Sequence, residues 1–296
     1  MAAMQKQTHE VPVWLKQRVT AEGMTAVGSL MRELGLNTVC QSADCPNIGE
    51  CFGAHTATFL ILGGVCTRHC RFCSVPKGRP ENLDLNEPDR VAQAVKTLGL
   101  RHAVITSVTR DDLADGGAGL FAACVQKVRQ LNSGTTLEVL VPDFGGDKDA
   151  LATVLESAPD VFNHNIETVP RLYPVVRPEA NYRRSLAVLR QAAEYGAGIT
   201  KSGLMVGLGE TGQEVTQVLQ DLAAAGVKAV TIGQYLRPSA EHLPVIEFVH
   251  PDKFKTYEKI GNSCGLRQVV AGPLVRSSYH AALLLDSKLT EDRQND

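Results

Sequence analysis

Long hydrophobic runs are absent from this chain of 296 residues. Its longest nearly apolar stretch, residues 57–66, is short and rich in glycine, whereas a membrane-spanning helix needs about 20 apolar residues. The N-terminus lacks a basic segment followed by an apolar one and is not rich in arginine. We therefore expect no membrane span, no secretory signal and no transit peptide, and we expect a cytoplasmic protein.

An excess of one charge sign is also missing, and aromatic residues are few. Thirty lysines and arginines face 32 aspartates and glutamates, and the chain has one Trp, six Tyr and eight Phe. This balance argues against a nucleic-acid partner, which would select a basic face and a base-stacking surface. Hydrophobic residues make up 44%, as in ordinary globular proteins. No large apolar helix face stands out, so a monomer is favoured.

From residue 56 onward, short apolar runs alternate with amphipathic stretches about six times. Such alternation predicts a parallel sheet, because parallel strands need crossover helices. Six units favour an α/β fold, an incomplete (β/α)6 barrel, although the pattern alone also fits a doubly wound sheet. The predicted strands cover residues 58–62, 103–108, 137–141, 161–166, 199–208 and 229–235, and the predicted helices cover 88–98, 120–131, 147–157, 183–195, 212–225 and 251–263.

The barrel is expected to cover residues 56–265, between an N-terminal extension, 1–55, and a C-terminal extension, 266–296. Short helices are expected at 14–19 and 25–35 of the first extension. In either parallel fold the active site lies beyond the C-terminal ends of the strands.

Cysteine is the informative residue, because six of the eight cysteines lie between Cys40 and Cys73. In a cytosolic chain of this size, clustered cysteines indicate metal or redox chemistry rather than disulfides. The two remaining cysteines, Cys124 and Cys264, fall in or next to predicted helices and are expected to be structural.

The first cysteine group, Cys66, Cys70 and Cys73, directly follows the first predicted strand. Three thiolates can hold three irons of a [4Fe–4S] cluster, which leaves the fourth iron open to a small chelating molecule. The alternative is a zinc knuckle of Cys70 and Cys73, which would need a second pair and would leave Cys66 unexplained.

The second group, Cys40, Cys45 and Cys51, lies in a loop rich in Asn, Asp, Pro and Gly. Its gaps of four and five residues match no common zinc motif and suit a second cluster. The alternative is a set of unrelated buried cysteines, but free cysteines seldom gather in polar loops.

The first group resembles the signature of the radical S-adenosylmethionine superfamily. Both groups together, with Arg276–Ala281 (RSSYHA) and Asn163–Thr168 (NHNIET), resemble the lipoyl synthase family over almost the whole chain. The resemblance implies that S-adenosylmethionine chelates the open iron of the first cluster and is cleaved to a 5′-deoxyadenosyl radical. It also implies that Phe72, next to Cys73, packs near the adenine, although an aromatic residue there is also ordinary core.

In that family the second cysteine group holds an auxiliary [4Fe–4S] cluster that donates sulfur. Its fourth ligand is a serine, which the resemblance places at Ser278. A serine ligand can be protonated and lost, and a cluster that gives up its sulfur must open.

The implied reaction inserts two sulfur atoms at carbons 6 and 8 of an octanoyl chain carried on a lysine. The implied partners are an octanoylated lipoyl carrier domain, from a 2-oxoacid dehydrogenase acyltransferase subunit or the glycine cleavage H protein, and an electron donor such as ferredoxin or flavodoxin. One rival is a methylthiotransferase, which would usually carry an RNA-binding domain. The other is a non-catalytic metal-binding interaction protein.

Polar residues at the predicted strand ends are candidates for contacts with S-adenosylmethionine. Thr106, Ser107 and Asp111 follow the second strand, where Asp111 or Asp112 could instead cap the next helix. Asn165 and Glu167 end the fourth strand and could equally cap the following turn. A further candidate, Glu210, lies in a glycine-rich turn after the fifth strand, where glycines allow close approach of the backbone to a ligand.

Overall fold

One eight-stranded sheet forms the centre of the molecule, in the order β1 to β8. The computed structural model describes residues 11–15, 24–39, 47, 56–196 and 198–278. The strands are β1 (Asn37–Thr38), β2 (Thr56–Ile61), β3 (His102–Ser107), β4 (Thr136–Leu140), β5 (Val161–Asn163), β6 (Ile199–Val206), β7 (Ala229–Gln234) and β8 (Gln268–Gly272). Strands β2 to β8 run parallel to one another, and β1 runs antiparallel to β2.

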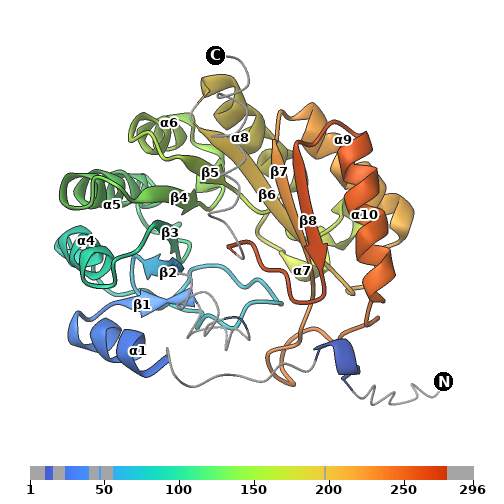
Figure 1. The fold of residues 1–296 in the computed structure, drawn as a ribbon, viewed down its shortest axis with the longest axis horizontal. Helices are drawn as coiled ribbons and strands as arrows, with labels where there is room; N and C mark the ends of the chain where they lie inside the picture. The colour runs from blue at the N-terminus through green and yellow to red at the C-terminus, as the bar shows by residue number, and fades with distance from the viewer. Residues whose placement is uncertain (1–10, 16–23, 40–46, 48–55, 197, 279–296) are drawn as a thin grey trace.

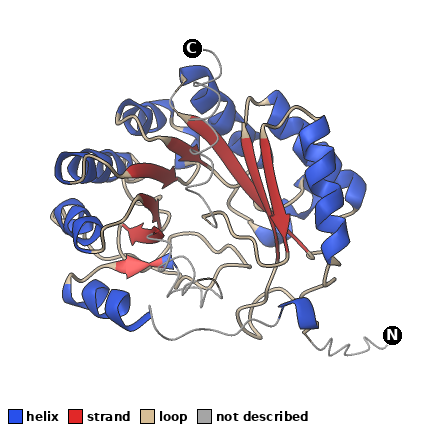
Figure 2. Ribbon diagram, viewed as in Figure 1, coloured by secondary structure: helices blue, strands red, loops and turns tan. Residues whose placement is uncertain are grey.

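Helices cover the outside of this curved sheet, as Figures 1 and 2 show. The α-helices are α1 (Met24–Glu33), α4 (Glu87–Thr97), α5 (Ala118–Leu131), α6 (Lys148–Glu156), α7 (Tyr173–Val176), α8 (Tyr182–Tyr195), α9 (Gly212–Ala224) and α10 (Pro251–Ser263). Short 3-10 helices are η1 (Val13–Leu15), η2 (Phe144–Gly146) and η3 (Pro170–Leu172). Within the described residues β8 pairs with β7 alone, so the barrel stays open between β8 and the first strands. The expected incomplete barrel is confirmed.

The expected strands and helices of residues 58–263 are all present, with small shifts at their ends. Two strands were not expected. Strand β8 lies within the predicted C-terminal extension and continues the parallel sheet from β7, and β1 adds an antiparallel edge within the N-terminal extension. Two short helices were expected in the N-terminal extension. The one expected at 25–35 is present as α1, and of the one expected at 14–19 the structure describes only the 3-10 helix η1, over residues 13–15. Among the described residues no helix is long and apolar enough to cross a membrane.

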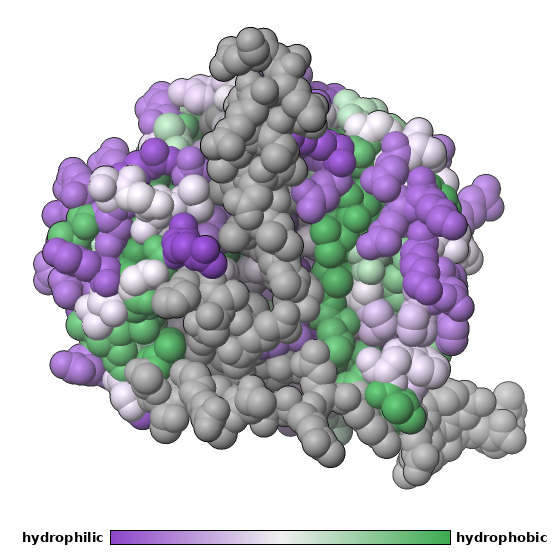
Figure 3. Space-filling view, in the orientation of Figure 1, coloured by the Kyte–Doolittle hydropathy of each residue, from purple (hydrophilic) through white to green (hydrophobic). Residues whose placement is uncertain are grey.

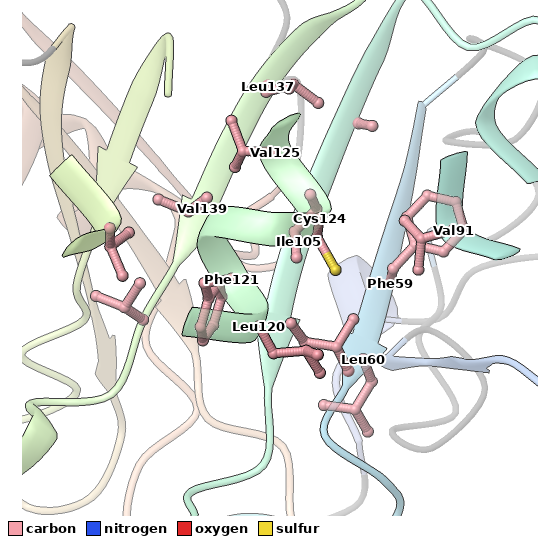
Figure 4. Packing of buried hydrophobic residues seen from close by; sticks show 14 of the residues in the cluster. Phe59, Leu60, Val91, Ile105, Leu120, Phe121, Cys124, Val125, Leu137 and Val139 are labelled. Carbon is pink, nitrogen blue, oxygen red and sulfur yellow. The ribbon is translucent and has the colours of Figure 1, made fainter. Parts of the chain in front are cut away.

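The main hydrophobic core fills the space between the outer face of the sheet and its helices. In Figure 4, Phe59 and Ile105 from the strands meet Val91 of α4 and Phe121 of α5. Cys124 lies fully buried in this layer, where burial raises the pKa of its thiol, so it has the surroundings expected of a structural cysteine. Hydrophilic side chains gather over the outer helices in the space-filling view (Figure 3).

The inner face of the barrel carries a buried polar layer beneath the strand ends. Nζ of Lys201 lies 3.0 Å from Oε2 of Glu138, and both side chains are at most 1% exposed. Asn163 donates to the same carboxylate at 2.7 Å, and His102 lies 3.8 Å from it. Burial alone would raise the pKa of Glu138, but the charge of Lys201 together with the contacts of His102 and Asn163 outweighs burial and holds this pKa below its ordinary value.

Candidate active site

The loop that follows β2 carries the first cysteine group and runs toward α7 (Figure 1). Its two ends are tied together, because the N–H of Cys66 donates to Pro76 and the N–H of Gly78 donates to Cys66, at 2.8 and 3.0 Å. Within the loop, Cys73 donates to the carbonyl of Cys70 at 3.3 Å. The three cysteines are half-buried and free of disulfides.

The surroundings of these thiols fit ligation to iron. Sγ of Cys66 accepts the backbone N–H groups of Thr109 at 3.3 Å and Arg68 at 3.5 Å, as a ligating sulfur does. Burial raises the pKa of Cys73 to about 11 and also raises the pKa of Cys70. Such thiols ionise when a bound metal compensates the charge. Within the described residues no three His, Cys, Asp or Glu side chains are grouped to hold a single ion, whereas cluster thiolates bind separate irons.

An ion-pair network fixes the loop to its neighbours. Arg68 pairs with Asp111 at 2.7 Å and with the fully buried Asp143 at 2.8 Å, and Asp143 also pairs with Arg184 at 2.7 Å. Burial would raise the pKa of Asp143, but its bonds to the two arginines hold that pKa well below its ordinary value. The loop after β2 is thereby joined to the loops after β3 and β4.

Among the residues predicted at the end of β3, Thr106 and Asp111 bond to other residues of the chain, whereas the hydroxyl of Ser107 does not. Thr106 donates to the carbonyl of Leu140 at 2.8 Å, and both carboxylate oxygens of Asp111 are held by Arg68. Oγ of Ser107 is buried and has no partner in the described structure, so it is available to a ligand. The alternative that Asp111 caps the next helix is wrong, because Gly117 is the N-cap of α5. Asp112 pairs with Arg110 instead.

Asn165 and Glu167 lie together just beyond β5. Nδ2 of Asn165 donates to Oε1 of Glu167 at 3.1 Å, while the buried Oδ1 of Asn165 has no partner within the described residues. Burial raises the pKa of Glu167, whose backbone has a positive φ of 65°. Neither residue caps η3, whose N-cap is Val169. An unpaired amide oxygen beside a buried carboxyl suits a ligand that carries hydroxyl or ammonium groups.

Glu210 and Phe72 lie near the ends of β6 and β7. The carboxylate of Glu210 accepts the N–H groups of Gly207 at 2.6 Å and Leu208 at 3.0 Å, so it shapes the glycine-rich turn. Phe72 packs against a small apolar cluster that includes Leu208 and Tyr235. The ring of Phe72 against this turn suits the binding of a flat heterocycle such as adenine. Direct contact of Phe72 or Glu210 with a ligand stays a prediction.

Cys40, Cys45 and Cys51, the ligands predicted for the second cluster, lie outside the described residues. Asn47, from the same loop, is described and is 2% exposed. Its Nδ2 donates to the carbonyl of Leu274 at 2.7 Å, four residues before Ser278. Ser278 is half-buried in the turn that follows β8. Asn47, which lies between Cys45 and Cys51 in the sequence, therefore contacts the segment that carries the predicted serine ligand.

Sequence reasoning missed two buried arginines. Arg68 lies between the cysteines but carries no motif signal, and Arg177 lies at the C-terminal end of α7. Arginine is usually a surface residue, so no local pattern distinguishes an arginine buried by tertiary contacts.

Comparison with known proteins agrees with this geometry. Residues 60–222 match the family model described as the radical SAM superfamily. The chain is similar in structure to methylornithine synthase (PylB), with a TM-score of 0.56 and 14% identity over 86% of this chain and 82% of that one. It is also similar to Streptococcus suis SuiB bound to S-adenosylmethionine, with a TM-score of 0.57 and 12% identity over 85% and 60%. At these identities the likeness concerns the fold alone.

The parallel partial barrel, the cysteine loop at its strand ends and the family match define the class: this chain belongs to the radical SAM superfamily. That membership implies a [4Fe–4S] cluster and S-adenosylmethionine. The chain is 56% identical to a lipoyl synthase of Caldanaerobacter subterraneus over 91% of its length and 95% of the relative. It is 58% identical to one of Rubrobacter xylanophilus, over 92% and 86%. It is therefore a member of the lipoyl synthase family.

Proposed function

We propose that this enzyme inserts two sulfur atoms at carbons 6 and 8 of a protein-bound octanoyl-lysine, which makes the lipoyl cofactor. Membership of the lipoyl synthase family supports this activity. Cys66, Cys70 and Cys73 would hold the cluster that binds S-adenosylmethionine. When bound, the two clusters supply the reducing electron that generates the 5′-deoxyadenosyl radical and the sulfur that enters the product.

The second cluster is proposed at Cys40, Cys45, Cys51 and Ser278. The hydrogen bond from Asn47 to the carbonyl of Leu274 supports this proposal, because Asn47 lies between Cys45 and Cys51 in the sequence and Leu274 lies four residues before Ser278. The serine turn itself follows β8, the parallel neighbour of β7, so it emerges at the same edge as the first cysteine group. Both sets of ligands would therefore face one substrate space at the strand ends.

The chain's own residues would position the reactants. The Arg68 network fixes the loop of the first cluster, and Ser107 and Asn165 offer unpaired polar atoms to S-adenosylmethionine. Such positioning matters because a primary alkyl radical abstracts hydrogen from whichever carbon lies within reach. The octanoyl chain would arrive on a lipoyl carrier domain that docks at this edge and leaves again, and a flavodoxin or ferredoxin would deliver electrons. We place this reaction in the cytoplasm.

Cys40→Ala and Cys70→Ala test the division of labour between the two clusters. The wild-type chain, reconstituted anaerobically, should hold about eight iron and eight sulfide, and each variant about four. Cys40→Ala should still form 5′-deoxyadenosine but make no lipoyl product, because it keeps the first cluster and lacks the sulfur donor. Cys70→Ala should lose both activities.

Cys264→Ala is the matched control, because Cys264 lies at the C-terminal end of α10, away from both proposed sites. It should keep full iron, sulfide and activity. Lipoyl formation by Cys40→Ala would remove the sulfur-donor role from the second group. Cleavage of S-adenosylmethionine by Cys70→Ala would show that the two groups have been assigned the wrong way round. Zinc in place of iron would favour a non-catalytic metal-binding protein.

A further inference from the structure

Arg177 is a buried cation whose nearest partners are neutral. Its side chain is 9% exposed, and Nη1 donates to the carbonyls of Asn165 at 3.1 Å and Ile166 at 3.3 Å. The guanidinium lies 5.5 Å above the ring of Tyr173, whose hydroxyl is 3.4 Å from Nη1. Within the described residues no carboxylate pairs with it, and its buried Nε has no partner. Because an uncompensated buried charge is costly, such a site calls for negative charge nearby.

The cysteine loop passes next to Arg177. The N–H of Arg71, one residue after Cys70, donates to the carbonyl of Val176 at 2.9 Å, so the loop contacts the residue next to Arg177. Burial raises the pKa of Cys70, and the charge of Arg177 is the largest effect that lowers it. Burial would lower the pKa of Arg177, but the charges of Tyr173, Glu167, Cys70 and Asp143, in decreasing order of effect, raise it.

We propose that Arg177 is a positioning residue that supplies a buried positive charge beside the cluster loop and thereby favours the reduced state of the cluster held by Cys66, Cys70 and Cys73. The inference rests on the cluster that membership of the superfamily implies. A cluster ligated by thiolates becomes more negative when it gains an electron, and a nearby buried cation stabilises the more negative state. The same side chain holds the backbone of Asn165 and Ile166, so the cation is fixed at the strand end.

Substitutions that separate charge from hydrogen bonding test this proposal. We would compare Arg177→Gln, which removes the charge, with Arg177→Lys, which keeps it. Both would be made in the full-length chain carrying Cys40→Ala, Cys45→Ala and Cys51→Ala, so that one cluster titrates. Dithionite would be the one-electron donor at a set ambient potential, and the ratio of reduced to oxidised cluster would be read from the electron paramagnetic resonance signal, with iron counted for each chain.

The Gln variant should show about a tenfold lower ratio of reduced to oxidised cluster, which is about 59 mV for one electron. The Lys variant should stay within about threefold of the parent. Arg171→Gln is the control, because Arg171 is exposed and pairs with Glu214. It should leave the ratio unchanged.

An unchanged ratio in the Gln variant with full iron would overturn the proposal and leave Arg177 a purely structural link. A Lys variant that shifts as far as the Gln variant would overturn it too, because the hydrogen bonds and not the charge would then matter. If the Gln variant fails to hold iron, a Lys variant that keeps iron and the parent ratio supports the proposal, and one that loses iron contradicts it. None of these outcomes depends on lipoyl formation, so the proposed function is tested separately.

Discussion

His164, at the end of β5, shows how one buried side chain joins three elements. Its Nδ1 donates to the carbonyl of Val141 at 2.8 Å, and its Nε2 accepts from the hydroxyl of Ser185 in α8 at 3.0 Å. The carbonyl can only accept, which assigns the proton to Nδ1. Burial, followed by the charge of Arg177, lowers the pKa of His164 to about 4. The histidine is therefore neutral in the folded protein.

This pKa predicts a dependence of stability on pH. Between about pH 6.5 and pH 4 the unfolded chain takes up a proton at His164 that the folded chain does not, so stability falls as pH falls through this range. Compared with His164→Gln, the wild type should lose about 1 kcal/mol of unfolding free energy for each pH unit below about 6.5. Urea unfolding at pH 7.5 and pH 5.5 measures this difference. Parallel losses in the two proteins would contradict it.

At the scale of elements, helix α9 begins with a reciprocal cap that also anchors the turn after β6. The hydroxyl of Thr211 accepts from the N–H of Glu214 at 3.2 Å, and the Glu214 carboxylate accepts from the N–H of Thr211 at 2.8 Å. Arg171 pairs with the same carboxylate at 2.7 Å. These bonds satisfy N–H groups that a helix start otherwise leaves unpaired.

Thr211→Ala should lower the free energy of unfolding by about 1 kcal/mol, because the cap is lost. Thr216→Ala is the matched control one turn further on, where the hydroxyl only donates back to the carbonyl of Gly212. That change should cost little, since alanine favours a helix interior and the back-bond adds little stability. Urea unfolding of the two variants compares them directly, and equal losses would argue against a specific role for the cap.

Periodicity predicted most of these elements, and the exceptions have physical causes. Strand β8 (Gln268–Gly272) is short and ends in glycine, so its sequence pattern alone does not predict a strand. It is a strand because it pairs with β7, which local sequence does not show. Strand β5 ends at Asn163, three residues earlier than predicted, because the hydroxyl of Ser202 in β6 donates to the carbonyl of His164 and accepts the N–H of Ile166, in place of backbone partners. Local pattern also cannot show which partner a polar side chain takes, and Asp111 accordingly pairs with Arg68 instead of capping a helix.

At the scale of the whole molecule, the parallel sheet gathers loops that are distant in sequence at one edge. The loop after β2 carries the three cysteines, and the ends of β3 and β5 carry Ser107 and Asn165. Asn47 and Leu274 join parts of the chain more than 200 residues apart at this edge. The cysteine spacing indicates three ligands for a first cluster from the sequence alone, and that assignment stays a prediction. The contact between Asn47 and Leu274 could not be predicted from the sequence, because it depends on how the whole sheet curves.

We propose that the chain's own second cluster supplies both sulfur atoms of the product, and isotopic labelling tests this proposal most directly. The full-length protein would be reconstituted with sulfur-34 sulfide and allowed a single turnover with S-adenosylmethionine, dithionite and an octanoyl-lysine peptide. Mass spectrometry of the lipoyl product should find both sulfur atoms labelled. A product whose sulfur is unlabelled, or 5′-deoxyadenosine formed without any lipoyl product, would contradict the account.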